Sequence, residues 1–308
     1  MRTLFASLNQ SRDLFPANEL FVTSETTLDA AFVASVASIG CRVSNVDFKK
    51  AKDARKAVNT AVNKATNGRV GRLLRDPLDA SNSWAAVQAF AAAPEWRTPF
   101  AEEPKKRSFL NHVSYVLPPM PISVPFLRTS GAFRARNDSA LSSLTLELPL
   151  KTNNSTKRSL HVIMPSTPLA LQNLNENLTF ADIETAFEKT AKSVARPLVV
   201  VLPKLKLESE HDLLDSLFAD LDFNVKVDLS AATKSATEQR VSTAFQRASL
   251  EFAETKGAPK EAEEEAREEV VISRPFLAVI RDDESGEWLS VARIQSLVDE
   301  SVVSFQFI

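Results

Sequence analysis

Short apolar runs of the length of a β-strand recur along much of the chain. In the clearest of them, leucine alternates with other residues from Leu144 to Leu150, which predicts a half-buried strand. Five more runs are typical of strands: Leu160 to Met164, Leu198 to Leu202, Leu250 to Phe252, Phe276 to Ile280 and Trp288 to Ile294. The last two are joined by residues 282–286, DDESG, which predict a hairpin loop with Gly286 at positive φ.

Two segments have the period of a helix instead. Within residues 46–74, apolar side chains recur at steps of three and four on one face: Ala51, Ala54, Val58, Ala61 and Ala65. Asn67 and Gly68 tolerate the left-handed conformation that ends a helix. Residues 210–221 predict a second helix. Because helices and strands are intermixed without a βαβ rhythm, the fold class is predicted to be α+β.

Composition excludes several classes of protein. The 308 residues carry 37 basic and 39 acidic side chains, which argues against a nucleic-acid-binding coat. Cys41 is the only cysteine, and the three histidines, His112, His161 and His211, are far apart, so we predict no disulfide, metal or cofactor. The six glycines form no phosphate-binding loop. No apolar run is long enough to span a membrane, and the first ten residues lack a signal-peptide core.

Taken together and in order, these segments resemble the serpin family. Residues 46–74 resemble the family's helix F and the strand before it, and residues 85–100 resemble a main-sheet strand followed by a W-x-x-P-F signature at Trp96, Pro99 and Phe100. The runs LTLELPL, SLHVIMP and LVVVLPKLKLESEHDLLDSLFADLDF resemble its central strands and the helix that follows. The segments VSTAFQRASLEFAETKGA and ISRPFLAVIRDDESGEWLSVARI resemble the strand entering the reactive loop and the closing R-P-F hairpin.

The resemblance implies a single serpin domain over residues 1–308, with a large central mixed or antiparallel sheet, smaller sheets and helices. Compared with the family, the chain begins near helix D, so the first three helices are expected to be missing. The reactive-loop equivalent is expected at residues 254–274. Residues 296–308 form a C-terminal extension, in which Val303, Phe305 and Phe307 alternate as in a compensating strand.

Family members trap serine or cysteine proteases by inserting a cleaved loop into the main sheet, so the hinge of the loop needs small residues at alternate positions. We place the hinge at Glu254, Gly257, Ala258, Pro259 and Lys260. One alternate set contains Lys260, Glu264 and Glu268, and the other contains Pro259, Glu261, Glu263 and Glu265. An unpaired buried charge costs several kcal/mol, and proline donates no hydrogen bond to a sheet. Insertion is therefore expected to be unfavourable.

The reactive-loop equivalent is also expected to be short and acidic, and its glutamates favour a helix. By resemblance, the candidate cleavage region contains Arg267, Val270, Val271 and Ile272, only a short distance before Pro275. Glu254 matches a hinge glutamate that pairs with a lysine of a neighbouring strand.

The region where the sheet opens departs from the family as well. Trp96 matches the family, whereas Gln88 and Gln246 stand where the family has asparagine and histidine. We expect both glutamines to be buried, either as amides that tie strands together or as parts of a functional switch. The basic cluster of residues 49–56 is expected to be a solvated helix face rather than a polyanion site.

Three functions remain open: a non-inhibitory serpin with a binding role, a suicide-substrate protease inhibitor, and an inactive degenerate copy. An enzyme is not expected, since no serine has the glycines of a nucleophile elbow, and each histidine is expected to be a surface or capping residue. The expected partner is a protease or an unidentified protein, and the chain is expected to be a monomer. The family implies an extracellular location, which suits the acceptor sequences at Asn9, Asn137, Asn153, Asn154 and Asn177; a cytoplasmic location is the alternative.

Overall fold

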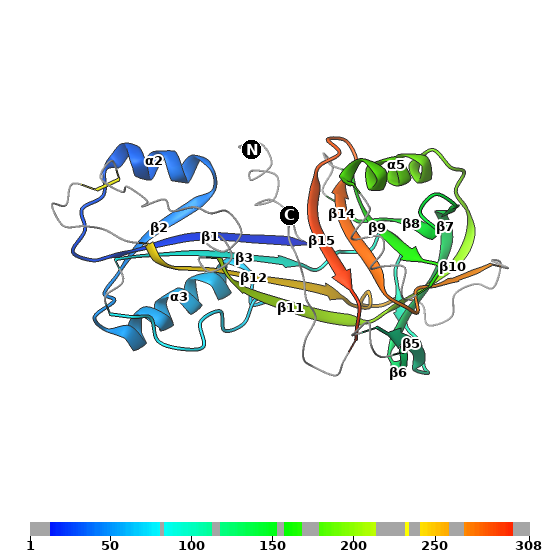
Figure 1. Cartoon of the computed structure of the whole chain (residues 1–308), viewed down its shortest axis with the longest axis horizontal. Coiled ribbons are helices and arrows are strands. Elements are labelled where there is room, and N and C mark those ends of the chain that lie inside the picture. The colour runs from blue at the N-terminus through cyan, green and yellow to red at the C-terminus, as the bar shows by residue number, and fades with distance from the viewer. Residues whose placement is uncertain are drawn as a thin grey trace. The chain divides into compact units, whose positions relative to one another are not determined.

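The computed structural model describes residues 13–80, 83–112, 118–152, 157–167, 179–213, 232–233, 241–258 and 268–297. The chain divides into two compact units (Figure 1). Unit 1 comprises Met1–Ala92 and Ser209–Ser249, and unit 2 comprises Ala93–Glu208 and Leu250–Ile308. The single domain expected over residues 1–308 stays a prediction.

The strands of unit 1 belong to a five-stranded sheet with the order β11-β12-β3-β1-β2. Their bounds are Leu205–Asp212 for β11, Val241–Phe252 for β12, Trp84–Ala92 for β3, Leu14–Thr23 for β1 and Cys41–Val46 for β2. Strand β1 pairs with β3 in antiparallel fashion and with β2 in parallel fashion. A mixed sheet results, as the family resemblance implies.

Two helices flank these strands on opposite sides in Figure 1. Helix α2, Ala30–Ser38, begins where the Asp29 carboxylate accepts hydrogen bonds from the Ala31 and Phe32 amides. Helix α3, Ala51–Ala65, is the helix predicted within residues 46–74. It ends as expected, because Asn67 and Gly68 both adopt positive φ, 52° and 75°.

Helix α3 packs its apolar face on this sheet, in direct contact with β1. Ala54, Val58 and Val62 of the helix are at most 2% exposed, and they share one core cluster with Val87 and Ala89 of β3. Strand residues alternate between the two faces of a sheet, so Gln88 lies on the face opposite to α3 and is exposed. One face of β3 is therefore apolar and closed, and the other is open to polar groups.

Unit 2 contains an eight-stranded sheet that runs β13-β10-β7-β8-β9-β14-β15, with β4 paired to β7. Its strands are β4 (Ala101–Glu102), β7 (Phe126–Asp138), β8 (Ser143–Pro149), β9 (Arg158–Pro165), β10 (Arg196–Pro203), β13 (Glu269–Val271), β14 (Phe276–Asp282) and β15 (Trp288–Ile294). A separate hairpin is formed by β5 (Arg107–Asn111) and β6 (Met120–Val124). The six predicted strands all lie within this set or at the end of β12.

Helix α5, Phe180–Ala191, lies over the strands of unit 2 (Figure 1). It was not predicted, although Thr179 and Asp182 form the capping box that could have located its start. Its buried Phe187 packs with Ile163 of β9 and with Val279 of β14. The predicted hairpin loop between β14 and β15 is confirmed, with Gly286 at φ 78°.

Two predictions made from the sequence are wrong. Residues 210–212 lie in strand β11, not in a helix, and the predicted helix beyond residue 213 lies outside the described residues. Strand β8 is buried on both faces rather than on one, since Thr145 and Glu147 are only 1% and 7% exposed. Arg134 compensates the charge of Glu147 at 2.8 Å, which alternation alone could not reveal. The expected strand at Val303, Phe305 and Phe307 lies outside the described residues.

Candidate functional site

The candidate site is the segment between β12 and β13, and its first part is fixed by Trp96. The Trp96 ring is 5% exposed and packs against Phe100 and Phe252, with centroids 4.9 and 5.6 Å away. Its indole Nε1 donates to the Ala253 carbonyl at 2.9 Å. Phe100 also exchanges hydrogen bonds with Thr255, donating to its Oγ1 and accepting from its amide. The chain is thus held for three residues beyond β12.

A turn follows at the predicted hinge. The Ala258 amide donates to the Thr255 carbonyl at 3.0 Å, and Gly257 adopts φ 77° between them. Glycine reaches this left-handed conformation without strain, so the residue type is explained by the turn itself. Pro259 and Lys260 lie outside the described residues.

The lysine expected to pair with Glu254 is Lys204, between β10 and β11. Its Nζ lies 2.5 Å from Oε2 of Glu102, and this hydrogen bond is the main reason why the pKa of Lys204 is raised. Glu254 is exposed and only adds a weaker electrostatic attraction. The expected partner is therefore present, but Glu102 occupies it.

The second end of the segment is paired in the sheet. Strand β13 lies parallel to β10, with Val200 opposite Val270, and the Ile272 amide donates to the Val201 carbonyl at 2.8 Å. Val270 and Ile272 are 6% and 1% exposed. Three of the four candidate cleavage residues, Val270, Val271 and Ile272, are thus held in or directly after a strand in this conformation, where a protease could not bind them. Arg267 lies outside the described residues.

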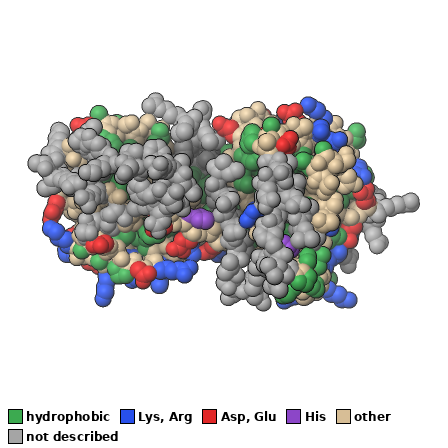
Figure 2. All heavy atoms as spheres, viewed as in Figure 1, with side chains coloured by type: hydrophobic (Ala, Val, Ile, Leu, Met, Phe, Trp, Pro, Cys, Tyr) green, Lys and Arg blue, Asp and Glu red, His purple; other side chains and the backbone are tan. Residues whose placement is uncertain are grey.

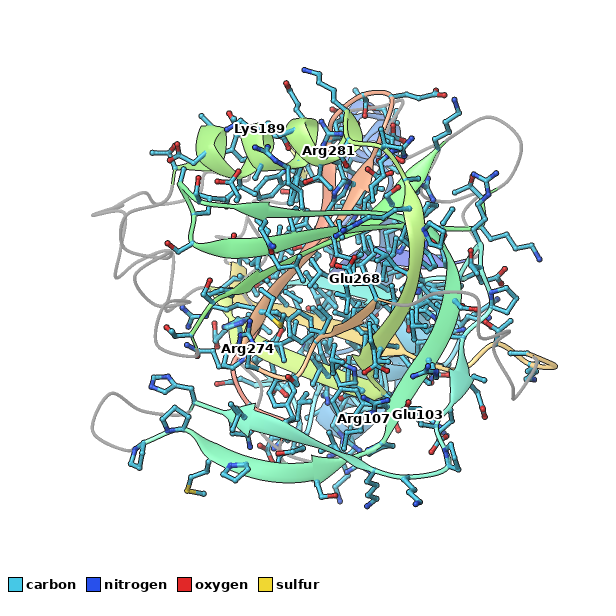
Figure 3. All side chains as sticks on the ribbon, turned by 90° about the vertical axis from the view of Figure 1, so that its right-hand side faces the viewer. Glu103, Arg107, Lys189, Glu268, Arg274 and Arg281 are labelled. Atoms are coloured by element: carbon cyan, nitrogen blue, oxygen red, sulfur yellow. The ribbon has the colours of Figure 1, made fainter. Side chains whose placement is uncertain are left out.

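Ion pairs reinforce this second end. Glu269 binds Arg107 at 3.1 Å and Arg128 at 2.5 Å, and Arg107 also binds Glu103 at 2.5 Å. Glu103 and Arg107 lie side by side in Figure 3. The neighbouring Glu268 pairs with Arg196 at 2.8 Å. We call Glu103, Arg107, Arg128 and Glu269 the β13 ion cluster.

The β13 ion cluster predicts a pH dependence. Arg107 holds the pKa of Glu269 below its usual 4.5, against an opposing effect of burial, and Arg128 adds to the lowering. A lowered pKa stabilises the folded state above the unfolded-state pKa, and the effect is lost as pH falls through the folded-state value. We expect Glu269→Gln to reduce the free energy of unfolding by about 1 kcal/mol at neutral pH, measured by urea unfolding.

The same series of measurements at decreasing pH provides the control. The difference between wild type and Glu269→Gln should shrink below pH 4.5, because the wild-type carboxylate becomes neutral as well. A difference that stays constant down to strongly acidic pH would mean that Glu269 acts through packing rather than charge.

The two sheet glutamines contact one another. Gln246 Nε2 of β12 donates to Gln88 Oε1 of β3 at 2.8 Å, so the amides join the two strands. The expectation that both are buried is wrong, because Gln88 is exposed and Gln246 only half-buried. They lie on the face of β3 that α3 leaves open.

The histidines differ from the expectation of surface or capping roles. His112 and His161 are 4% and 1% exposed, and only His211 is half-buried. His161 stacks on Phe187, with centroids 4.4 Å apart, and its Nε2 is 3.7 Å from Oδ1 of Asp283. Ser159 donates to that same aspartate instead of to the histidine. The trio therefore lacks the serine–histidine contact that a nucleophilic serine needs.

The basic cluster at the start of α3 is neutralised in part. Lys49 pairs with Glu25, Lys50 pairs with Asp47, and Arg55 donates to the carbonyl of Arg75. Basic and acidic side chains are mixed along the edge of unit 1 where α3 lies (Figure 2). A solvated helix face explains this cluster.

Several residues of the site were not found from the sequence. They are Glu102, Glu103, Arg107, Arg128, Lys204 and Thr255. Arg107 and Glu269 are 162 positions apart, so no local spacing marks them, and only the sheet brings them together. Within the described ranges, no three His, Cys, Asp or Glu residues could hold a metal ion, and no helix is long and apolar enough to cross a membrane.

Comparison with known proteins gives a consistent result. A family model described as "Serpin (serine protease inhibitor)" matches residues 1–297. Serpin H1 of Gallus gallus is 26% identical over 262 residues, which are 82% of this chain and 61% of that protein. Antichymotrypsin-2 of Bombyx mori is 29% identical over 268 residues, covering 82% of this chain and 68% of that protein. The chain thus spans about two thirds of the length of these relatives.

Solved structures agree on the fold. Uncleaved ovalbumin superimposes with a TM-score of 0.77 at 22% identity, over 96% of this chain and 78% of ovalbumin. Native protease nexin-1 with heparin superimposes with a TM-score of 0.75 at 21% identity, over 96% and 81% of the two chains. At this level of identity the likeness establishes the fold alone.

Proposed function

The chain belongs to the serpin family, and from this premise we propose that it is a binding protein with weak or no protease-inhibitory activity. Its curated relatives include proteins named for inhibition, such as Antichymotrypsin-2. Inhibition of a protease requires that the cleaved loop enters the main sheet next to β3. We propose that this insertion is unfavourable in this chain.

One observation carries the proposal: α3 and residues 70–78, which follow it, place apolar side chains in the same buried cluster as Ala89 of β3. Val58 and Val62 of α3 are 0% exposed and lie in one cluster with Ala89. A strand inserted beside β3 would direct every second side chain towards α3. A charge brought there would lose its hydration without gaining a partner, which costs several kcal/mol.

Both ways of inserting the loop bring charges to this face. One alternate set directs Lys260, Glu264 and Glu268 towards α3, and the other directs Glu261, Glu263 and Glu265. Even if part of each penalty were relieved by protonation, several charged groups would be buried at once. Insertion is therefore unfavourable in either register.

The distal end of the loop supports the same proposal. Insertion would have to pull the residues before β13 out of their present position. Glu268 pairs with Arg196, and Glu269 pairs with Arg107 and Arg128, so these ion pairs oppose that movement. An intact loop of this kind is suited to contact a protein partner through its acidic residues rather than to insert into the sheet.

A functional protease inhibitor is the second candidate, and the hinge geometry favours it. Gly257 keeps the positive φ of a turn, and Lys204 still lies within electrostatic reach of Glu254. A third possibility, a degenerate copy without activity, predicts that no partner binds. We also propose an extracellular, N-glycosylated protein, because the acceptor Asn137 is exposed on β7; the other acceptors lie outside the described residues.

The proposal is tested by incubating the protein with trypsin-like, chymotrypsin-like and papain-like proteases and analysing the products on SDS gels. We expect cleavage of the loop without a covalent complex. The melting temperatures of intact and cleaved protein should agree within about 2 °C, because no strand is added to the sheet.

A loop variant serves as the matched control. Replacing Lys260, Glu261, Glu263, Glu264 and Glu265 by alanine removes most of the charges but keeps the length of the loop. If charge prevents insertion, cleavage of this variant should raise its melting temperature. An SDS-stable complex formed by the unmodified protein would instead establish the inhibitor and refute the proposal.

A further inference from the structure

Unit 2 contains a cavity of about 530 Å³ that is separate from the loop site. Its walls come from the segment after β3, from β7, from both ends of the connection between β8 and β9, and from the turn after β14. The lining residues that matter for its chemistry are charged: Arg97, Arg134, Glu147, Lys151, Lys157, Arg158 and Asp283. Its volume lies within the usual range of small-molecule sites.

Backbone hydrogen bonds hold the walls together. The Arg97 amide donates to the Pro149 carbonyl at 3.2 Å, and the Lys151 amide donates to the Glu95 carbonyl at 2.7 Å. On the other side, the Leu150 amide donates to the Arg158 carbonyl and the Asp283 amide donates to the Lys157 carbonyl, at 2.9 and 2.8 Å. These hydrogen bonds fix the described parts of the wall relative to one another, which lowers the entropy lost on binding.

The charges around the cavity do not balance. Five basic side chains face two carboxylates, which leaves a net charge of +3. Both carboxylates are already engaged, Glu147 by Arg134 at 2.8 Å and Asp283 by the Ser159 hydroxyl at 2.8 Å. Among the described residues, no ion pair engages Arg97, Lys151 or Lys157. The positive charges of these three side chains at the cavity therefore remain uncompensated.

The wall of the cavity also contains a buried arginine, Arg158, and apolar side chains. Arg158 is 4% exposed and Leu150 is 4% exposed. A buried guanidinium offers hydrogen bonds of fixed geometry to phosphate or sulfate, while Leu150 and Pro149 offer a surface to a carbon skeleton. The exposed rim residues Arg97, Lys151 and Lys157 could attract an anion from solution.

We propose that this cavity binds a small polyanion that carries at least two phosphate or sulfate groups. Three uncompensated cations match a ligand with two to three negative charges, and the volume accommodates a molecule larger than a single inorganic ion. The basic cluster of residues 49–56 is the competing surface; Lys49 and Lys50 are paired with Glu25 and Asp47, whereas Lys52 and Lys56 of α3 are exposed and make it the surface to test as a control.

Isothermal titration calorimetry at low ionic strength tests the proposal on the full chain. The probes are fructose 1,6-bisphosphate for the phosphate source, fructose 1,6-disulfate for the sulfate source, and sucrose as the neutral control. We expect saturable binding of at least one polyanion, no binding of sucrose, and an affinity that falls as salt is added. Comparison of the two polyanions shows which group the cavity prefers.

Paired variants locate the binding. Arg97→Gln with Lys157→Gln removes two rim charges from the cavity and should weaken binding about tenfold or more, which corresponds to about 1.4 kcal/mol. Lys52→Gln with Lys56→Gln removes two charges from α3 and should leave the affinity unchanged. All four positions are exposed, so neither variant should alter the melting temperature.

Any of three results would overturn the proposal. The first is that neither polyanion binds to the folded protein. The second is that the cavity variant binds as well as wild type, and the third is that the α3 variant loses as much affinity as the cavity variant, because binding would then be elsewhere or unspecific.

Discussion

Replacing Ala89 by glutamate should destabilise unit 1 by at least about 3 kcal/mol, because it buries a carboxylate without a partner. Ala89 is 1% exposed on the face of β3 that α3 covers. The new side chain would meet the same apolar surface that an inserted loop strand would meet. The change in the free energy of unfolding, measured with urea, thus estimates the penalty on which the proposed function rests.

The neighbouring position supplies the control. Gln88 lies on the opposite, exposed face of β3 and accepts a hydrogen bond from Gln246. Gln88→Glu keeps that acceptor, so its effect should stay within about 0.5 kcal/mol. Ala89→Met adds volume without charge and should cost about 1–3 kcal/mol through overpacking.

The decisive measurement compares the losses in free energy of unfolding caused by Ala89→Glu and by Ala89→Met. If Ala89→Glu is no more destabilising than Ala89→Met at neutral pH, the face tolerates charge and loop insertion is not prevented by it. If charge is the cause, the excess cost of the glutamate should diminish at acidic pH, where the carboxyl group becomes neutral.

Replacing Trp96 by alanine is the second change with a large expected effect, about 3–5 kcal/mol of lost stability in unit 2. The ring fills the space between Phe100 and Phe252, and its Nε1 satisfies the Ala253 carbonyl. Loss of this anchor should also release the first residues of the loop segment. Limited proteolysis should therefore cut the chain near residues 253–258 faster in the variant.

Trp96→Phe separates packing from hydrogen bonding. It keeps an aromatic ring in the same place but removes the donor and part of the ring volume, so it should cost about 1–2 kcal/mol, less than Trp96→Ala. A similar rate of proteolysis in wild type, Trp96→Phe and Trp96→Ala would contradict the role of Trp96 as an anchor of the segment.

Local patterns predicted the regular elements well. The period of the alanines and valines located α3, and short apolar runs, one of them alternating, located six strands, because each element buries one face or both. The same logic failed at residues 210–212, where the sequence LKLESEHD alternates as a strand and not as a helix. Helix α5 was overlooked, although its capping box is a local signal.

The site was less predictable. The family resemblance placed Glu254 and Gly257 in the hinge and Trp96 in the region where the sheet opens. The structure gives each of the three a physical role in or near the segment after β12. Exposure was misjudged for Gln88, His112 and His161, because burial depends on what other elements cover a strand. The sequence does not state which helix covers which face.

By itself, the sequence determined the family, the strands and the charged loop, since these depend on residue order and local period. The folded structure was needed to show that α3 shares one buried cluster with β1 and β3, that Glu102 holds Lys204, and that five basic residues surround one cavity in unit 2. The physical reason is the same in each case. Burial and electrostatic pairing depend on residues far apart in the chain, and only the folded sheets bring such residues within contact distance.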